Sequence, residues 1–380
     1  LTLAKSFHYS GRFEINGNLA DYNCVLYSML ISLAYFVYQP ETILLVMRIM
    51  GVLVMCSAVF PIYAMAQKIL HDEKKAFLIS VITLLMPYMF DTAYIMQEVL
   101  SYPLFLWTIY IWYCATEKGN EQNIGKYILC AFFSALCFFT KTYLFFIPVI
   151  INLMCVPELA DKSRRVPVCK KLMVYDITYI ICVVLAYASV FALNGFAKGS
   201  NHYSTQFSAI FPITGWTVAS AAVGIVVYSA LFLLNTAVLP IPAIVYFRKK
   251  FAESERKLVD FTLLSIAVLI AEIVVLIVLT EEGVPTVPHK FLFRYFQILV
   301  PPVLILFAKI WKEEAFLQSK KVHAVTLTAF FVALVYFCGM QGKTRQSIID
   351  GHLYLLLENI SKYILPYADV LSVVVVCGVL

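Results

Sequence analysis

Four charged residues stand near the ends of long apolar stretches of this 380-residue chain: Arg48, Glu98, Lys141 and Arg294. A charged side chain within a bilayer costs about 3 kcal/mol or more, so such residues are candidates for function. Basic groups beside a carboxylate suit group transfer from a lipid-linked phosphate. The cations neutralise the phosphate leaving group, and the carboxylate takes the proton of an acceptor hydroxyl.

Each of these residues also has a purely structural interpretation. Arg48 could reach phosphate headgroups from a helix end, and Lys141 could anchor a hairpin. Arg294 could lie at the membrane interface, while Glu98 could cap a helix N-terminus, where a carboxylate favours the helix dipole. Glu272 lies inside a further apolar stretch, and the sequence assigns it no partner, with pairs to Arg48 or Arg294 left open.

The composition is that of a membrane protein. Hydrophobic residues make up 62% of the chain and charged residues 14%, against about a quarter charged in soluble domains. About 20 apolar residues in a helix cross the bilayer, so we expect an all-α, polytopic transmembrane helical bundle. The expected spans lie near 43–68, 76–92, 98–115, 125–140, 142–157, 172–193, 217–247, 259–280, 291–309 and 321–340, with a truncated one from 366.

Most of the 29 Lys and Arg residues fall in alternate gaps between these spans, near 68–75, 118–126, 162–171, 248–257 and 309–321. Cytoplasmic loops carry such an excess, which predicts that these gaps face inward. The net charge of +6 then faces anionic lipid, and no nucleic-acid partner is expected.

Two regions follow from this orientation. Residues 1–42 are expected to be part of a first extracytoplasmic loop with interfacial helices, and residues 43–380 a transmembrane domain of about eleven spans. Within the loop we expect an amphipathic stretch that turns at Ser10-Gly11, an extended piece over 12–18 and an apolar helix over 24–38. Because the loop would lie outside, we also expect a preceding span.

Other outer segments are expected at 194–212 and 341–365, the second with the spacing of an interfacial helix. Most of the ten cysteines lie in apolar runs, and no disulfide framework is expected. Familiar soluble motifs are missing: Gly342-Lys343-Thr344 lacks the upstream glycine of a phosphate loop. His8, His202 and His289 are scattered, and metal binding by them is not expected.

Four segments resemble the polytopic glycosyltransferases of the GT-C superfamily, which include protein O-mannosyltransferases, the lipid A aminoarabinose transferase and bacterial polyprenyl-phosphate-sugar transferases. The segments are Leu3 to Phe13 with Val25-Leu26-Tyr27-Ser28, then Arg48 to Ala66, then Met96-Gln97-Glu98-Val99-Leu100-Ser101-Tyr102-Pro103, and finally Thr140-Lys141 with Arg294-Tyr295 before Pro301. Their order and their expected side of the membrane match as well.

The resemblance implies transfer of a sugar from a polyprenyl- or dolichyl-phosphate donor to an acceptor glycan, lipid or protein. The active site would face outward from the bilayer, and we expect a bacterial plasma membrane. Glu98 would be an acidic catalytic residue, while Lys141, Arg294, Tyr295 and Arg48 would bind the lipid phosphate. No cofactor is implied, and a divalent metal is optional.

The family's catalytic base is an Asp or Glu at the start of the first outer loop, which we expect to fall before Leu1. Glu14 and Asp21 are weaker alternatives within the chain. The family's Pro-Leu-Tyr reads Val25-Leu26-Tyr27 here, which is a departure from the pattern.

Two other classes of membrane protein stay open as alternatives. One is a polytopic transporter or lipid flippase, and the other is a membrane subunit without catalysis. Transporters usually have repeated halves and charges near the bilayer midplane. No halves match in this chain, and its intramembrane charges lie toward the expected outer side.

Overall fold

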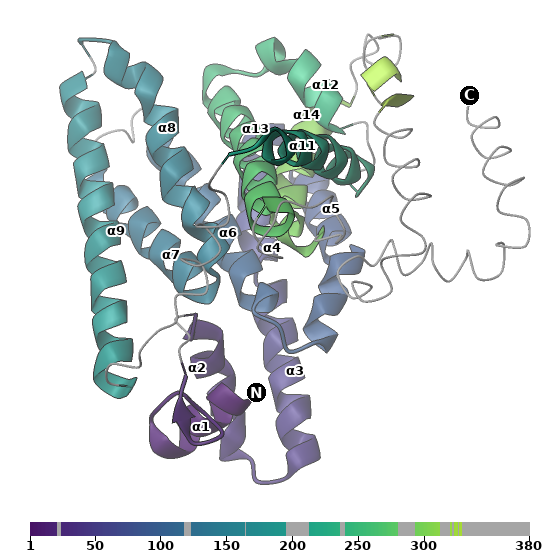
Figure 1. Ribbon diagram of the computed structural model, residues 1–380. Coiled ribbons are helices and arrows are strands. Elements are labelled where there is room, and N and C mark those ends of the chain that lie inside the picture. Colours follow the sequence, from purple (N-terminus) through teal and green to yellow (C-terminus); the bar gives the residue numbers. More distant parts are fainter. Residues whose placement is uncertain are drawn as a thin grey trace, which may run out of the picture.

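The structure, a computed structural model, is a helical bundle with a small N-terminal module at one end (Figure 1). It describes residues 1–20, 24–117, 123–163, 165–194, 213–235, 240–279 and 293–311, together with residue 320 and a few positions over 323–328. The all-α, polytopic architecture expected from the sequence is confirmed.

The N-terminal module comprises the elements before Val37. They are α1 (Thr2–Ser10), β1 (Glu14–Ile15), β2 (Asn18–Leu19), α2 (Leu26–Ser32) and the 3₁₀ helix η1 (Leu33–Phe36). Helix α1 ends where Gly11 adopts a left-handed conformation, with φ 68°, and its N–H bonds the carbonyl of Phe7. The expected extended piece is a two-stranded antiparallel hairpin, which turns at Asn16 and Gly17 with positive φ at both residues.

The bundle follows directly. Its elements are α3 (Pro40–Cys56), α4 (Val59–Leu70), α5 (Glu73–Leu84), η2 (Pro87–Ala93), α6 (Glu98–Thr116), α7 (Ile124–Thr140), η3 (Thr142–Phe145), α8 (Phe146–Ala160), α9 (Arg165–Asn194), α11 (Gly215–Asn235), α12 (Pro240–Tyr246), η4 (Arg248–Lys250), α13 (Glu253–Ile273), the π-helical η5 (Val274–Leu279), η6 (Phe293–Tyr295), η7 (Gln297–Leu299) and α14 (Val300–Ile310).

Helix α6 is the centre of the bundle and α9 lies at its edge. In the apolar 18-residue stretch of α6, 78% of the residues are buried inside the molecule, whereas in that of α9 the buried share is 0%. Helix α6 packs against α3, α4, α7, α13 and η7, and its Trp112 ring lies 4.6 Å from the ring of Phe261 in α13. The exposed apolar side chains of α9 are compatible with contact with lipid, because the hydrocarbon of a bilayer is as apolar as they are.

Five helical stretches among the described residues are long and apolar enough to cross a membrane. They are Pro40–Leu70, Glu98–Thr116, Thr142–Ala160, Arg165–Leu193 and Glu253–Leu276. Within the expected span over 217–247, the structure describes α11 up to Asn235 and α12 from Pro240, and residues 236–239 lie outside the described residues. The expected segments at 341–365 and from 366, most of 194–212 and nearly all of 321–340 lie outside the described residues.

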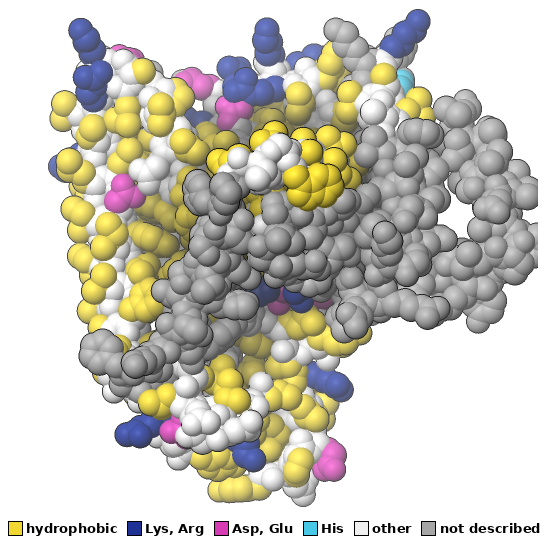
Figure 2. Space-filling view, in the orientation of Figure 1, with side chains coloured by type: hydrophobic (Ala, Val, Ile, Leu, Met, Phe, Trp, Pro, Cys, Tyr) yellow, Lys and Arg dark blue, Asp and Glu magenta, His cyan; other side chains and the backbone are white. Residues whose placement is uncertain are grey.

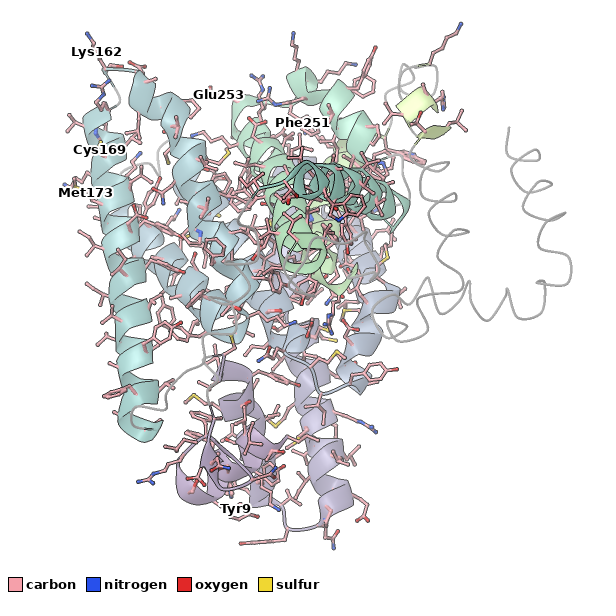
Figure 3. All side chains as sticks on the ribbon, in the orientation of Figure 1. Tyr9, Lys162, Cys169, Met173, Phe251 and Glu253 are labelled. Atoms are coloured by element: carbon pink, nitrogen blue, oxygen red, sulfur yellow. The ribbon has the colours of Figure 1, made fainter. Side chains whose placement is uncertain are left out.

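The end of the bundle opposite the N-terminal module is rich in basic side chains. Figure 2 shows Lys and Arg gathered there, and Figure 3 places Lys162 and Glu253 at that end and Tyr9 at the other. Among the described residues, the ion pairs that join elements here include Lys68–Glu117 at 2.6 Å, Lys257–Glu158 at 3.0 Å and Lys309–Glu255 at 3.0 Å. We call this the basic end.

Replacing Trp112 tests the central packing. Trp112→Ala leaves a cavity between α6 and α13, and we expect it to lower the free energy of unfolding by about 3–5 kcal/mol. Trp311→Ala is the matched control, because Trp311 is 61% exposed. Thermal unfolding of both variants in one detergent measures the difference. Equal unfolding temperatures would contradict the placement of α6 at the centre.

Candidate functional site

Glu98 is a buried carboxylate at the first position of α6. Its side chain is 4% exposed. A carboxylate in the first turn of a helix favours the dipole, which explains why α6 begins here. The preceding residue, Gln97, donates a hydrogen bond from Nε2 to the carbonyl of Cys24 at 3.0 Å, and so ties this helix start to the N-terminal module.

Lys141 reaches Glu98 from the break between α7 and α8. Its backbone is extended, with φ −151° and ψ 122°, and its N–H bonds the carbonyl of Cys137 as α7 ends. The 3₁₀ turn η3 begins at the next residue, so a single residue separates two helical elements. The Lys141 ammonium donates a hydrogen bond to Oε1 of Glu98 and forms an ion pair with it.

Arg294 supplies a second cation from the short η6 turn. Its Nε lies 3.5 Å from Oε1 of Glu98, and its side chain is 28% exposed. One buried carboxylate therefore faces two cations from different elements, which leaves a net positive charge at this point. Such a site favours an anionic ligand, because a buried charge needs an opposite charge nearby.

Two tyrosines enclose the cations. The rings of Tyr143 and Tyr295 meet edge to face with centroids 4.6 Å apart. The Lys141 ammonium lies 5.6 Å from the Tyr143 centroid and 5.0 Å from that of Tyr295, and the Arg294 guanidinium lies 5.4 Å from the Tyr295 centroid. Aromatic faces attract cations at these distances. We call Glu98, Lys141, Arg294, Tyr143 and Tyr295 the Glu98 cluster.

The N-terminal module closes one side of the cluster. The thiol of Cys24 donates to the carbonyl of Phe138, with sulfur and oxygen 3.8 Å apart. Burial raises the pKa of the Cys24 thiol, against the opposing influence of Thr142 and Lys141. Burial, with the nearby charge of Glu98, also raises the pKa of Tyr27 to about 12, so the phenol is protonated at neutral pH.

The structure brings together four of the five residues that the sequence proposed for the site, namely Glu98, Lys141, Arg294 and Tyr295. Arg48 is not among them: it is exposed on α3, and no contact joins it to the cluster in the described part of the chain. Their roles in catalysis and binding stay predictions.

Sequence reasoning gave no role to Tyr143, although it lies two residues after Lys141. It also missed Cys24 and Tyr27, whose place beside the cluster follows from how the N-terminal module docks on α7.

Several other candidates do not join the site. Asp21, His202, His289 and the Gly342-Lys343-Thr344 segment lie outside the described residues. Glu14 lies in strand β1 of the N-terminal module. Over the residues that the structure describes, no group of three or more His, Cys, Asp and Glu is placed to hold a metal ion. The expectation that no cofactor is needed and that a divalent metal is optional stays a prediction.

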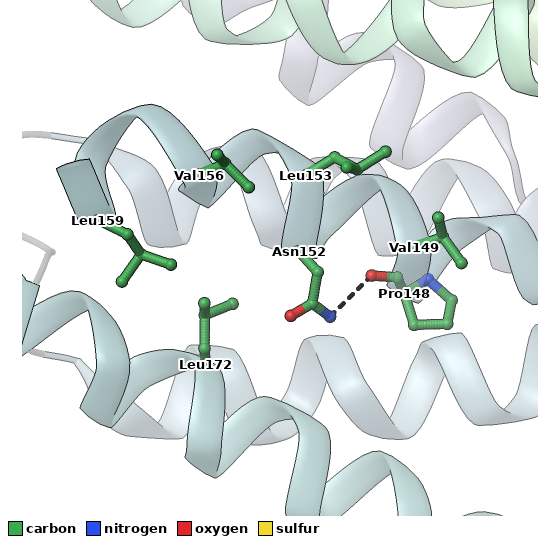
Figure 4. A pocket seen from close by; sticks show the side chains of 7 residues that line it. All are labelled: Pro148, Val149, Asn152, Leu153, Val156, Leu159 and Leu172. Carbon is green, nitrogen blue, oxygen red and sulfur yellow. Dashed lines mark hydrogen bonds between the residues drawn. The ribbon is translucent and has the colours of Figure 1, made fainter.

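An apolar cavity of about 460 Å³, open on one side, lies between α8 and α9. Figure 4 shows the side chains that line it: Pro148, Val149, Asn152, Leu153, Val156, Leu159 and Leu172. Its polar group is Asn152, whose Nδ2 donates to the carbonyl of Pro148 and to Oδ1 of Asp176, both at 2.9 Å. The cavity begins one turn of α8 beyond η3, the turn that follows Lys141.

The geometry of the Glu98 cluster fits chemistry on a phosphate ester. Lys141 and Arg294 can neutralise charge that develops on a phosphate leaving group, an effect that is stronger in a site shielded from water. Glu98 holds both cations in place before the anion arrives. The apolar cavity near the same helix break offers surface for a hydrocarbon chain.

Residues 25–191 match the family model of the dolichyl-phosphate-mannose-protein mannosyltransferases. The match runs from α2 into α9 and includes Glu98 and Lys141, while Arg294 lies beyond it. No curated protein and no solved structure matches the chain. The family match supports a glycosyltransferase of the GT-C type, and the apolar helices support an integral membrane protein.

A double-mutant cycle tests whether the cluster is a coupled unit. Glu98→Ala leaves two cations without their carboxylate, and we expect a loss of about 3–5 kcal/mol in the free energy of unfolding. Adding Lys141→Met removes one of the stranded charges, so the double variant should be less destabilised than the two single variants combined. Thermal unfolding in detergent gives the coupling energy. Additivity within about 0.5 kcal/mol would show that the pair does not interact.

Proposed function

We propose that this GT-C-type membrane glycosyltransferase moves a sugar from a polyprenyl- or dolichyl-phosphate donor to an acceptor on the outer face of the membrane. The acceptor class is a hydroxyl of a glycan, a lipid or a protein. The observation that carries the proposal is the meeting of Glu98, Lys141 and Arg294 from three separate elements. The family match over residues 25–191 points to the same donor chemistry.

The reaction is a displacement at the anomeric carbon. The acceptor oxygen forms a bond to that carbon from the face opposite the phosphate, which inverts its configuration. The bond between the carbon and the phosphate oxygen breaks, and the lipid phosphate leaves with the electron pair. The acceptor's proton passes to a carboxylate base.

Lys141 and Arg294 bind the phosphate and stabilise the charge that it gains on leaving. Glu98 holds these two cations before the donor binds. As the phosphate draws the ammonium and guanidinium toward itself, Oε1 of Glu98 is released. Glu98 is then the carboxylate of the cluster that can accept a proton.

The outward orientation is supported by the distribution of charge. Cytoplasmic loops are enriched in Lys and Arg, which favours the inner face of the membrane for the basic end. The N-terminal module lies at the opposite end and contacts the start of α6 and the end of α7 (Figures 1 and 3). The Glu98 cluster would then lie beneath the outer surface, in keeping with the bacterial plasma membrane expected from the sequence.

The apolar cavity between α8 and α9 is the candidate site for the lipid tail. A headgroup at Lys141 lies at the start of η3, and the chain can run along α8 from Pro148 toward Leu159. Apolar side chains line this path apart from Asn152. Burial of a hydrocarbon chain is favourable by about 0.8 kcal/mol per CH₂ removed from water.

Substitution of the cations tests the proposal. Lys141→Ala and Arg294→Ala each remove a positive charge that is worth most when the leaving group carries its full charge. We expect each to lower kcat/KM for a polyprenyl-phosphate sugar by about 100-fold. The measurement is release of radiolabelled sugar from the donor by purified protein in lipid nanodiscs.

Lys162→Ala is the control, since Lys162 is an exposed lysine at the basic end (Figure 3). It should turn over the donor at the wild-type rate. Unchanged donor turnover in both Lys141→Ala and Glu98→Ala would reject the proposed function. Transport of the lipid-linked sugar across the bilayer, without transfer, would instead favour a flippase.

A further inference from the structure

Three buried polar atoms near the Glu98 cluster make no hydrogen bond within the part of the chain that the structure describes. They are the hydroxyl of Tyr143, Oε2 of Glu272 and Nε2 of Gln297. Tyr143 is 6% exposed and Gln297 is 1% exposed. A buried polar group without a partner is unfavourable, so such groups call for an explanation.

Tyr143 connects this set to the cluster. Its ring contacts that of Tyr295 and lies beside the Lys141 ammonium. Its hydroxyl is close enough to the carboxylates of Glu98 and Glu272 to interact electrostatically with both. Glu272 therefore places a second carboxyl group beside the site, and it forms no ion pair within the described residues.

Gln297 lies on the same chain segment as Arg294 and Tyr295. It begins η7, which packs against α6 and α13, the helices that carry Glu98 and Glu272. The three unsatisfied atoms thus belong to η3, α13 and η7, the elements that surround the cluster.

The backbone just after Glu272 is unusual. Helix α13 ends one residue later and continues as the π-helical η5. Helix α11 packs closely on η5 at Gly224, where an added Cβ would lie 3.0 Å from a methyl group of Val274. Short π-helical segments occur frequently at functional sites, because they redirect side chains at the cost of regular hydrogen bonding.

These groups do not suit a phosphate. None of the three brings a positive charge that could hold an anion, whereas the Tyr143 hydroxyl and the Gln297 amide can donate hydrogen bonds and the Glu272 carboxyl group can accept them. A neutral ligand that bears several hydroxyl groups satisfies all three. Such a ligand would lie beside the phosphate that Lys141 and Arg294 hold.

We propose that Tyr143, Glu272 and Gln297 form the subsite that binds the hydroxyl groups of the donor sugar. This inference rests on the proposed function and deepens it. The site then has two parts: Lys141 and Arg294 recognise the lipid phosphate, and Tyr143, Glu272 and Gln297 recognise the sugar. The subsite is unsatisfied without donor, so the sugar supplies hydrogen bonds that the protein lacks.

Binding of two probes tests whether separate residues recognise the phosphate and the sugar. Polyprenyl-phosphate mannose and polyprenyl phosphate differ by the sugar alone, and their affinities can be measured by microscale thermophoresis in nanodiscs. Tyr143→Phe and Glu272→Gln should each weaken binding of the sugar-bearing probe by about tenfold, the loss of roughly 1.4 kcal/mol. Neither should change binding of polyprenyl phosphate, whereas Lys141→Ala should weaken both.

Thermal unfolding without ligand separates recognition from a structural role. Tyr143→Phe removes a hydroxyl that has no partner, so its unfolding temperature should equal or exceed that of the wild type. The matched control is Tyr175→Phe, because the Tyr175 hydroxyl is buried and donates to Ser134 at 2.9 Å. This control should lower the unfolding temperature and leave both affinities unchanged.

The outcomes are distinct. If Tyr143→Phe and Glu272→Gln weaken both probes equally, or neither probe, the sugar subsite is overturned while the phosphate site stands. If the wild type binds neither probe, the proposed function itself is overturned.

Discussion

The burial of one carboxylate constrains the whole site. Glu98 is almost fully shielded from solvent, and an ionised carboxylate in such a place needs opposite charge close by. That requirement draws the break between α7 and α8, through Lys141, and the η6 turn, through Arg294, to the start of α6. Because α6 is the central helix, the packed core holds the carboxylate that both cations face.

The two ends of the bundle differ in how their charged side chains are paired. At the basic end, Lys68, Lys257 and Lys309 each face a single carboxylate, so charge is balanced within each pair. At the other end, one carboxylate faces two cations between tyrosine rings. An excess of positive charge in a shielded site has no structural benefit of its own, whereas it favours binding of an anion. The difference separates ion pairs that join helices from a cluster that can act on a ligand.

Much of this could be predicted from the sequence. Apolar length and alternating basic gaps predict the bundle, and Ser10-Gly11 marks the end of α1 correctly. Residue order cannot show which helix ends meet, so Glu98, Lys141 and Arg294 could be proposed separately but not paired. Arg48 is likewise a charged residue near the end of an apolar stretch, but in the structure it is exposed on α3. Tyr143 and Gln297 carry no charge, and Glu272 had no assignable partner, so their shared surroundings depend on tertiary packing.

The most direct test is a cryo-electron microscopy structure of the protein with polyprenyl phosphate. The account predicts density for the phosphate in contact with the Lys141 ammonium and the Arg294 guanidinium, and a longer separation between Lys141 and Glu98 than in the protein without ligand. A phosphate bound elsewhere, with the pairing of Glu98 and Lys141 unchanged, would contradict it.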